Sequence, residues 1–278
     1  MKKSILKIMI VCLGIILLIG MLLPAVVILA GSFMSGMELN SYYFQNQMIE
    51  EFRFIPIRFT LGQYYEAMIG NTEYTRALLN TVWFAIVSAS LTMLIAIPAA
   101  YVMALCHIPG KKLIAAVYFM LMLLPYQAIE MPHYFILHDL GVLGSDWSVA
   151  LTTIFDTFDV MILTAFFMTI STDTIEAAAI DGAGTLKTFL LIVIPQMKHG
   201  ILTVAMLKLL NVWNLTEQPI MFLDNTTQYP LAVMLRTLST KYASSSFAFA
   251  IVFVLPLFLA YQIIFDDLEA TIAMGRIK

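Results

Sequence analysis

The stretch Glu176–Pro195, EAAAIDGAGTLKTFLLIVIP, decides how this chain is organised, because it is a polar, small-residue segment between two very hydrophobic ones. Its three alanines at 177–179 are strong helix formers and leave a low-profile surface that can sit in a groove. Gly182 can adopt the left-handed conformation that ends a helix. The apolar run Leu186–Ile194 predicts a second short helix at the membrane edge, before Pro195 turns the chain. The segment therefore predicts a short helix that projects from the membrane and can dock on a partner.

The composition predicts that the rest of the chain lies in a lipid bilayer. Of its 278 residues 61% are hydrophobic and only 12% are charged, far fewer than in soluble domains. A spanning helix needs about 20 mainly apolar residues. Six segments meet this requirement: Ile8–Ala30, Leu78–Cys106, Leu113–Pro132, Val149–Ile170, Ile201–Leu223 and Phe247–Phe265. We therefore expect an all-α integral membrane protein with one transmembrane domain over residues 1–278, whose first apolar run is retained as a span.

The positions of Lys and Arg predict the orientation, because cytoplasmic loops of membrane proteins carry an excess of these residues. If both termini are cytoplasmic, nine of them lie inside: Lys2, Lys3, Lys7, Lys111, Lys112, Lys187, Lys198, Arg276 and Lys278. Five then lie outside: Arg53, Arg58, Arg76, Arg236 and Lys241. We expect cytoplasmic termini, an external loop at 31–77 and a cytoplasmic loop at 171–198 that includes the projecting helix.

The spacing within the opening stretch carries a resemblance to a known family. It reads E-A-A-x-x-x-G, then nine residues, then I-x-I-P. This resembles the coupling loop of the permease subunits of ABC importers, E-A-A-x-x-x-G-x(9)-I-x-L-P, with Ile194 in place of Leu. Further stretches resemble motifs of the carbohydrate (maltose-type) class: Leu79–Thr81, Leu124–Pro132, Leu140–Val142, Asn211–Asn214 with Pro219, and Gly275–Lys278. The chain departs from that class at Ser171–Thr174, where a proline is usual, and at Leu215, where an aromatic residue is usual.

The resemblance implies a fold and a set of partners. The fold would be that of a type I ABC importer permease, with six transmembrane helices and a cytoplasmic coupling helix. A second permease would form a heterodimer with this chain in the bacterial cytoplasmic (inner) membrane, above two ABC ATPase subunits, and an extracytoplasmic sugar-binding protein would deliver the cargo. ATP and Mg would bind the partner ATPase, and this chain would hold no cofactor. The implied ATPase-coupling residues are Glu176, Ala177, Ala178, Asp181, Gly182 and Pro195.

Polar and aromatic side chains in the later spans are candidates for the path of the cargo. They are Tyr126, Asp159, Asn211, Trp213, Asn214, Glu217 and Gln218. Polar groups are costly in the bilayer and usually face a cavity or another helix. Asn211, Asn214 and Gln218 are spaced i, i+3 and i+7, which predicts one face of the fifth helix. Amides and carboxylates suit sugar hydroxyls and aromatic rings suit sugar rings, but the same polar groups could form hydrogen bonds between helices instead.

Two other classes of function have weaker support. Asp156 and Asp159, at i and i+3, could form the cation site of an ion-gradient-driven secondary transporter, although no inverted repeat is visible. The segment Gly182–Thr188 lacks the spacing of a phosphate-binding loop, and no metal-ligand spacing or catalytic motif is present. We therefore expect no metal site and no enzymatic activity in this chain. Since it has no basic patch, we expect no nucleic-acid partner.

Overall fold

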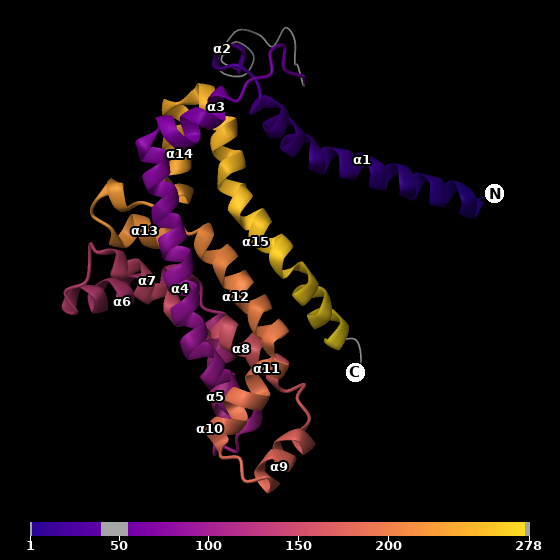
Figure 1. Ribbon diagram of the computed structural model, residues 1–278, viewed down its shortest axis with the longest axis vertical. Coiled ribbons are helices and arrows are strands. Elements are labelled where there is room, and N and C mark those ends of the chain that lie inside the picture. Colours follow the sequence, from indigo (N-terminus) through magenta and orange to yellow (C-terminus); the bar gives the residue numbers. More distant parts are fainter. Residues whose placement is uncertain (1, 40–54, 276–278) are drawn as a thin grey trace. The chain divides into compact units, whose positions relative to one another are not determined.

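The computed structural model describes residues 2–39 and 55–275, and within them the backbone is helical or irregular, without a strand (Figure 1). The first helices are α1 (Lys2–Gly31), α2 (Gly36–Leu39), α3 (Gly62–Tyr65) with the π-helical turn η2 (Glu66–Gly70), α4 (Thr72–Leu105), α5 (Lys111–Met122) and α6 (Tyr126–Asp139). Next come α7 (Asp146–Ile154), α8 (Thr157–Phe167), α9 (Thr172–Ile180), α10 (Thr185–Thr188), η3 (Phe189–Val193), α11 (Ile194–Gln196) and α12 (Lys198–Trp213). The last are α13 (Glu217–Phe222), η4 (Thr226–Gln228), α14 (Leu231–Lys241), η5 (Ala243–Ser245) and α15 (Ser246–Gly275). Residues 40–54 of the predicted external loop and 276–278 of the C-terminal motif lie outside the described residues.

Four helical segments are long and apolar enough to cross a membrane: Met9–Gly31, Thr72–Leu105, Asp146–Phe167 and Ala243–Gln262. Two pairs of helices pass the same test together but are bent, by 98° between α5 and α6 and by 75° between Thr185–Gln196 and α12. The described part of the chain therefore has four candidate spans, or six if each bent pair counts as one. The predicted all-helical membrane fold is confirmed, and each of the six predicted segments corresponds to one of these features.

The predicted third segment, Leu113–Pro132, does not form one continuous helix. Helix α5 ends at Met122 and α6 begins at Tyr126 after a sharp bend. Pro125 stands at the break in an extended conformation, with φ −65° and ψ 141°. Proline has no N–H to donate to the preceding turn and disfavours helical geometry in the residue before it, so the helix stops there.

The predicted fifth span, Ile201–Leu223, is also interrupted. Helix α12 ends at Trp213, and α13 is a separate short helix. The Asn214 amide donates to the carbonyl of Leu210 (2.9 Å), which satisfies one of the carbonyls left open at the helix end. Because of this break, the prediction that Asn211, Asn214 and Gln218 share one face of a single helix is wrong.

The helices form two compact units. The first comprises the described residues up to 76 together with 234–256. Its buried Gln63 donates from Nε2 to the carbonyls of Gly31 (2.8 Å) and Met34 (2.7 Å), where α1 ends. These two hydrogen bonds tie α3 to the backbone at and just beyond the C-terminal end of α1, where carbonyls lack the regular helical partners.

A second buried contact holds the first unit together. Tyr74 of α4 is fully buried and stacks on Phe249 of α15, with ring centroids 4.5 Å apart. Its hydroxyl donates to the backbone carbonyl of Phe249 (2.7 Å). We expect Tyr74→Phe to keep the stacking but to lower the free energy of unfolding by about 1 kcal/mol, the usual net value of one buried hydrogen bond. The midpoint of thermal unfolding in detergent measures this, with Tyr65→Phe as control because Tyr65 is 63% exposed. Equal midpoints for Tyr74→Phe and the wild type would contradict the prediction.

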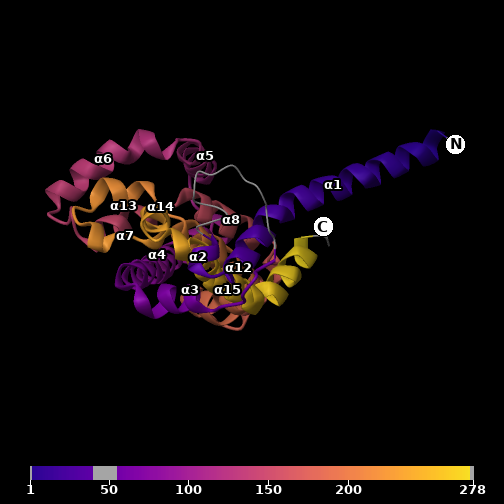
Figure 2. The ribbon, with the colours of Figure 1, turned by 90° about the horizontal axis from the view of Figure 1, so that it is seen from above.

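The second unit comprises residues 77–233 and the described residues from 257 onward. Its core lies where α4, α8 and α12 meet, and it is built from Met93, Ala96, Ala100, Tyr101, Val160, Leu163, Phe167, Ile170, Val193, Met197 and Val204. The small Ala96 and Ala100 are four residues apart on α4, which lets neighbouring helices approach closely without relying on bulky contacts. Thr153 donates to Ser88 (2.8 Å) and so ties α7 to α4. In the view from above, α6 runs outside α7 and α13 (Figure 2).

Candidate functional site

The projecting helix expected from the opening stretch is present as α9. Ser171 precedes it in an extended conformation, and its hydroxyl accepts the N–H of Asp173 (3.3 Å), as expected of an N-cap. The helix ends at Ile180, and Gly182 follows with φ 78°. The N–H of Ala183 donates back to the carbonyl of Ala178 (2.9 Å), which closes the helix end. Figure 1 shows α9 at one end of the second unit, beyond the core helices of that unit.

The side chains of the segment 171–198, which contains α9 and is called the α9 loop below, divide into an exposed set and a buried set. Of the six residues proposed for coupling, Glu176, Ala177, Asp181, Gly182 and Pro195 are exposed. Ala178 is only 6% exposed, so its side chain packs inward and does not belong to the free surface. Ile180 is 86% exposed and Leu186 is 69% exposed. The loop thus presents apolar side chains among polar ones, a composition suited to a protein partner.

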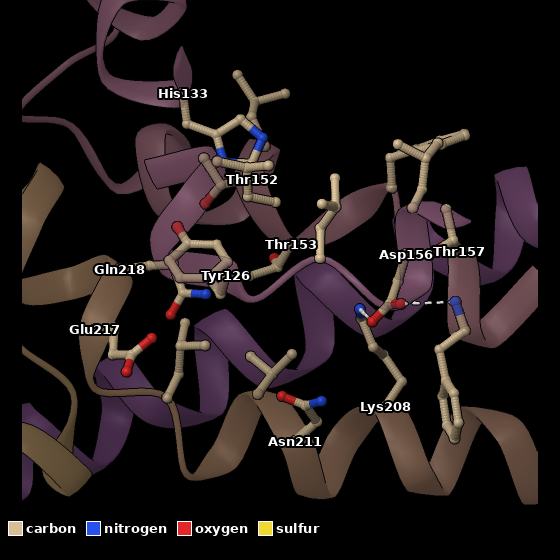
Figure 3. A pocket seen from close by; sticks show the side chains of 18 of the residues that line it. Tyr126, His133, Thr152, Thr153, Asp156, Thr157, Lys208, Asn211, Glu217 and Gln218 are labelled. Carbon is tan, nitrogen blue, oxygen red and sulfur yellow. Dashed lines mark hydrogen bonds and ion pairs between the residues drawn. The ribbon is translucent and has the colours of Figure 1, made fainter. Parts of the chain in front are cut away.

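A cavity of about 710 Å³ lies within the second unit. Its walls come from α5, α6, the junction of α7 and α8, the end of α12 and the start of α13 (Figure 3). The polar lining residues are Tyr126, His133, Thr152, Thr153, Asp156, Thr157, Lys208, Asn211, Asn214, Thr216, Glu217 and Gln218. Both helix breaks, at Pro125 and at Asn214, border this space. Irregular backbone at membrane depth is tolerated where it lines a cavity, so the breaks and the cavity belong together.

One wall of the cavity carries a buried ionic cluster. The Lys208 Nζ lies 3.0 Å from Asp156 Oδ2 and 3.2 Å from Asp159 Oδ2. The side chains of Lys208 and Asp159 are 3% and 4% exposed, whereas that of Asp156 is 29% exposed and faces the cavity. Asp156 also caps α8, because its Oδ1 accepts the N–H of Phe158 (3.0 Å). The cluster joins α12 to the break between α7 and α8.

The opposite part of the cavity is polar and uncharged except for one carboxylate. Figure 3 shows Tyr126, Thr152 and Gln218 facing the same space, with His133 beside them. The hydroxyl of Tyr126 and Nδ1 of His133 are buried and make no hydrogen bond within the described residues. Glu217 accepts a hydrogen bond from the Gln127 amide (2.8 Å). Buried polar atoms without a partner are costly, and both Tyr126 and His133 belong to the lining of the cavity.

The structure brings five of the seven predicted path residues to the cavity: Tyr126, Asn211, Asn214, Glu217 and Gln218. Trp213 is 3% exposed and does not line it, and Asp159 lies behind Lys208. His133 was missed as a path residue, although it follows Tyr126 by seven positions and so shares its helical face. In the described residues no group of three or more His, Cys, Asp and Glu could hold a metal ion.

An all-helical chain with several candidate spans, broken helices and a polar cavity among them defines a membrane-embedded transport protein. Residues 96–273, more than half of the chain, match the family described as "Binding-protein-dependent transport system inner membrane component". The chain belongs to this family. Members are the membrane component of their transport systems, and the chain is accordingly not the ATPase of such a system.

Individual relatives agree with this assignment, and one solved structure shares the fold. The chain is 27% identical over 214 residues to the polygalacturonan/rhamnogalacturonan transport system permease protein YtcP of Bacillus subtilis (strain 168), covering 77% of this chain and 71% of that protein. It is 28% identical over 211 residues to the diacetylchitobiose uptake system permease protein NgcG of Streptomyces coelicolor, covering 72% and 68%. A chain from the crystal structure of a bacterial ABC transporter involved in import of the acidic polysaccharide alginate has the same fold. Its TM-score is 0.82 at 19% identity, covering 95% of this chain and 97% of that one.

Proposed function

We propose that this chain is the permease subunit of an ATP-driven importer, that it forms half of the translocation path for a carbohydrate, and that α9 couples this path to a separate ATPase. The observation that carries the proposal is the combination, in one unit of one chain, of a polar cavity and an exposed, capped helix that projects from the helical core. A cavity alone would suit any transporter. A projecting helix with apolar residues on its surface needs a partner outside the membrane.

The geometry of α9 supports the coupling role. Capping at Ser171 and termination at Gly182 hold the helix as a defined unit with its exposed face free. Ile180 and Leu186 supply apolar contact area, and Glu176 and Asp181 flank it with charge. Such a patch matches the usual anatomy of a protein interface, in which apolar residues are ringed by polar ones. The docking residues are therefore proposed to be Glu176, Ala177, Asp181, Gly182 and Pro195, with Ala178 supporting them from below.

The chemistry of the cavity supports a carbohydrate as cargo. The amides of Asn211 and Gln218 can donate to and accept from sugar hydroxyls, and Glu217 can accept from them. The ring of Tyr126 offers a flat apolar surface. The two relatives described above carry saccharides in their names, which favours the same class of cargo for this chain. The proposal places the path along Tyr126, Asn211, Asn214, Glu217 and Gln218.

The proposal includes the assembly. A second permease would complete the path as a heterodimer, two ABC ATPase subunits would bind ATP and Mg, and an extracytoplasmic sugar-binding protein would deliver the cargo. The distribution of Lys and Arg favours cytoplasmic termini in the bacterial inner membrane, with α9 on the side where ATP is available. Asp156 and Asp159 are held by Lys208, which favours a structural role for them over the cation site of a gradient-driven transporter.

Transport in native membrane vesicles tests the proposal. Inverted vesicles expose the ATPase face, and right-side-out vesicles loaded with ATP expose the delivery face. We expect ATP-loaded right-side-out vesicles to take up a labelled oligosaccharide in the presence of the binding protein, and a protonophore to leave the uptake unchanged. We also expect the tagged chain to copurify in mild detergent with an ABC ATPase and a second permease. Uptake that ignores ATP and stops when the ion gradient collapses would favour the secondary transporter and contradict the proposal.

A further inference from the structure

The cation in the cavity wall is already neutralised. Lys208 is the one lysine or arginine among the lining residues, and it contacts two carboxylates, Asp156 at 3.0 Å and Asp159 at 3.2 Å. Its side chain is 3% exposed, so little of the ammonium can reach a ligand. A buried charge that has its partners in place is strongly held by them. Lys208 is therefore unavailable to bind an acidic sugar.

A further carboxylate in the cavity has no cation beside it. Glu217 is exposed to the cavity, and its hydrogen bond comes from the neutral amide of Gln127 (2.8 Å). None of the lysine and arginine side chains that the structure describes forms an ion pair with it. Three carboxylates, those of Asp156, Asp159 and Glu217, thus accompany one ammonium at this cavity. Their net charge with Lys208 stays negative even if the deeply buried Asp159 holds a proton.

We infer that this cavity selects uncharged saccharides and rejects those that bear carboxylates, with Glu217 as the residue that determines this specificity. The inference rests on the proposed function, because it concerns the cargo of the same cavity. Membership of the family does not decide the point, since saccharides of both kinds occur among its members' names. The charges of the side chains that line this cavity decide which kind of saccharide it accepts.

The physical argument compares the two kinds of sugar at the same site. A hydroxyl of a neutral sugar can donate to Glu217, while its oxygens accept from Gln218 and Asn211 and a ring face lies on Tyr126. A uronate brings its own carboxylate, which Glu217 repels when the two carboxylates come close together. Sites that bind carboxylates supply an arginine or lysine for them, and this cavity has no free one among its lining residues.

The first experiment measures the charge of the cavity without needing to know the cargo. Cys12 and Cys106, the native cysteines, are replaced by alanine, and Asn211→Cys places a thiol in the cavity of the complete transporter. The rates of its modification by a cationic and by an anionic methanethiosulfonate reagent are compared at pH 7.5. We expect the ratio of the cationic rate to the anionic rate to be at least about ten times the same ratio for a free thiol in solution. Glu217→Gln should reduce this preference several-fold, and added salt should weaken it.

The matched control is Asp139→Asn, which removes one negative charge from an exposed position outside the cavity. It should leave the ratio of the two rates unchanged. Equal rates for the two reagents, a faster anionic reagent, or the same ratio with and without Glu217→Gln would overturn the inference.

The second experiment uses uptake by the complete system, with labelled neutral oligosaccharides and oligosaccharides of the same linkage whose C6 carries a carboxylate. The methyl esters of the latter serve as neutral probes of identical skeleton. We expect uptake of neutral sugars and no uptake of free uronates. If uronates enter as fast as their neutral counterparts, the inference about charge is wrong while the proposed function stands. If no saccharide of either class enters in an ATP-dependent manner, the proposed function itself is wrong, and the assignment of sugars to the cavity fails with it.

Discussion

Replacing Lys208 with methionine is expected to lower the free energy of unfolding by about 3–5 kcal/mol, because it leaves two carboxylates in the protein interior without their cation. Lys208 is 3% exposed and joins α12 to Asp156 and Asp159 at the break between α7 and α8. Methionine fills much of the same space but cannot pair with a carboxylate. The loss should appear as a large drop in the temperature at which the detergent-solubilised protein loses its monodisperse peak in size-exclusion chromatography.

Two further variants separate the charge effect from a packing effect. Lys208→Met combined with Asp156→Asn and Asp159→Asn removes the uncompensated charges, and it should recover most of the lost stability. Lys198→Met at the exposed start of α12 removes a lysine charge from the same helix and should have little effect. If Lys208→Met alone is as stable as the wild type, the ionic cluster does not hold these helices together.

Replacing Gly182 with phenylalanine is expected to lower transport at least about tenfold while the protein still folds, which corresponds to a loss of about 1.4 kcal/mol or more in the coupling step. Gly182 has φ 78°, and a Cβ built there would meet no atom within 4 Å. The folding cost is therefore limited to the strain of a left-handed residue, about 1–2 kcal/mol. The bulky ring would instead stand on the exposed end of α9, where the ATPase is proposed to dock. Uptake, copurification of the ATPase and the amount of folded permease are measured together.

Gly141→Phe is the matched control for backbone strain. Gly141 has φ 68° and likewise no atom within 4 Å of a built Cβ, but it lies in the turn after α6, away from the α9 loop in the chain. It should reduce stability by a similar amount and leave copurification of the ATPase intact. Gly182→Asn is a second control, because asparagine tolerates the left-handed region and adds little bulk. Normal uptake by a well-folded Gly182→Phe variant would refute the coupling role of α9.

Features that depend on neighbouring residues were predictable from the sequence. The apolar runs predicted the spans, since burial in a bilayer follows from the length and composition of one segment. The start and end of α9 were predictable because Ser171 and Gly182 act on adjacent backbone groups. The bend at Pro125 also has a local cause. Choosing segments by their length and average hydropathy does not detect such a bend.

Features that depend on residues far apart in the chain were decided by the tertiary structure. Lys208 pairs with Asp156 and Asp159 only because the packing of α8 against α12 brings them within 3.2 Å, about fifty positions apart in the sequence. The same packing buries Trp213 and leaves Asn211 facing the cavity, although the two residues are only two positions apart and lie within one turn of α12. Composition and local propensity determined that this chain is a helical membrane protein with a projecting helix. The way the helix faces pack decided which side chains share a cavity and what charge that cavity carries. A helix in lipid can bury any face that finds a partner, so the sequence of one helix does not decide this.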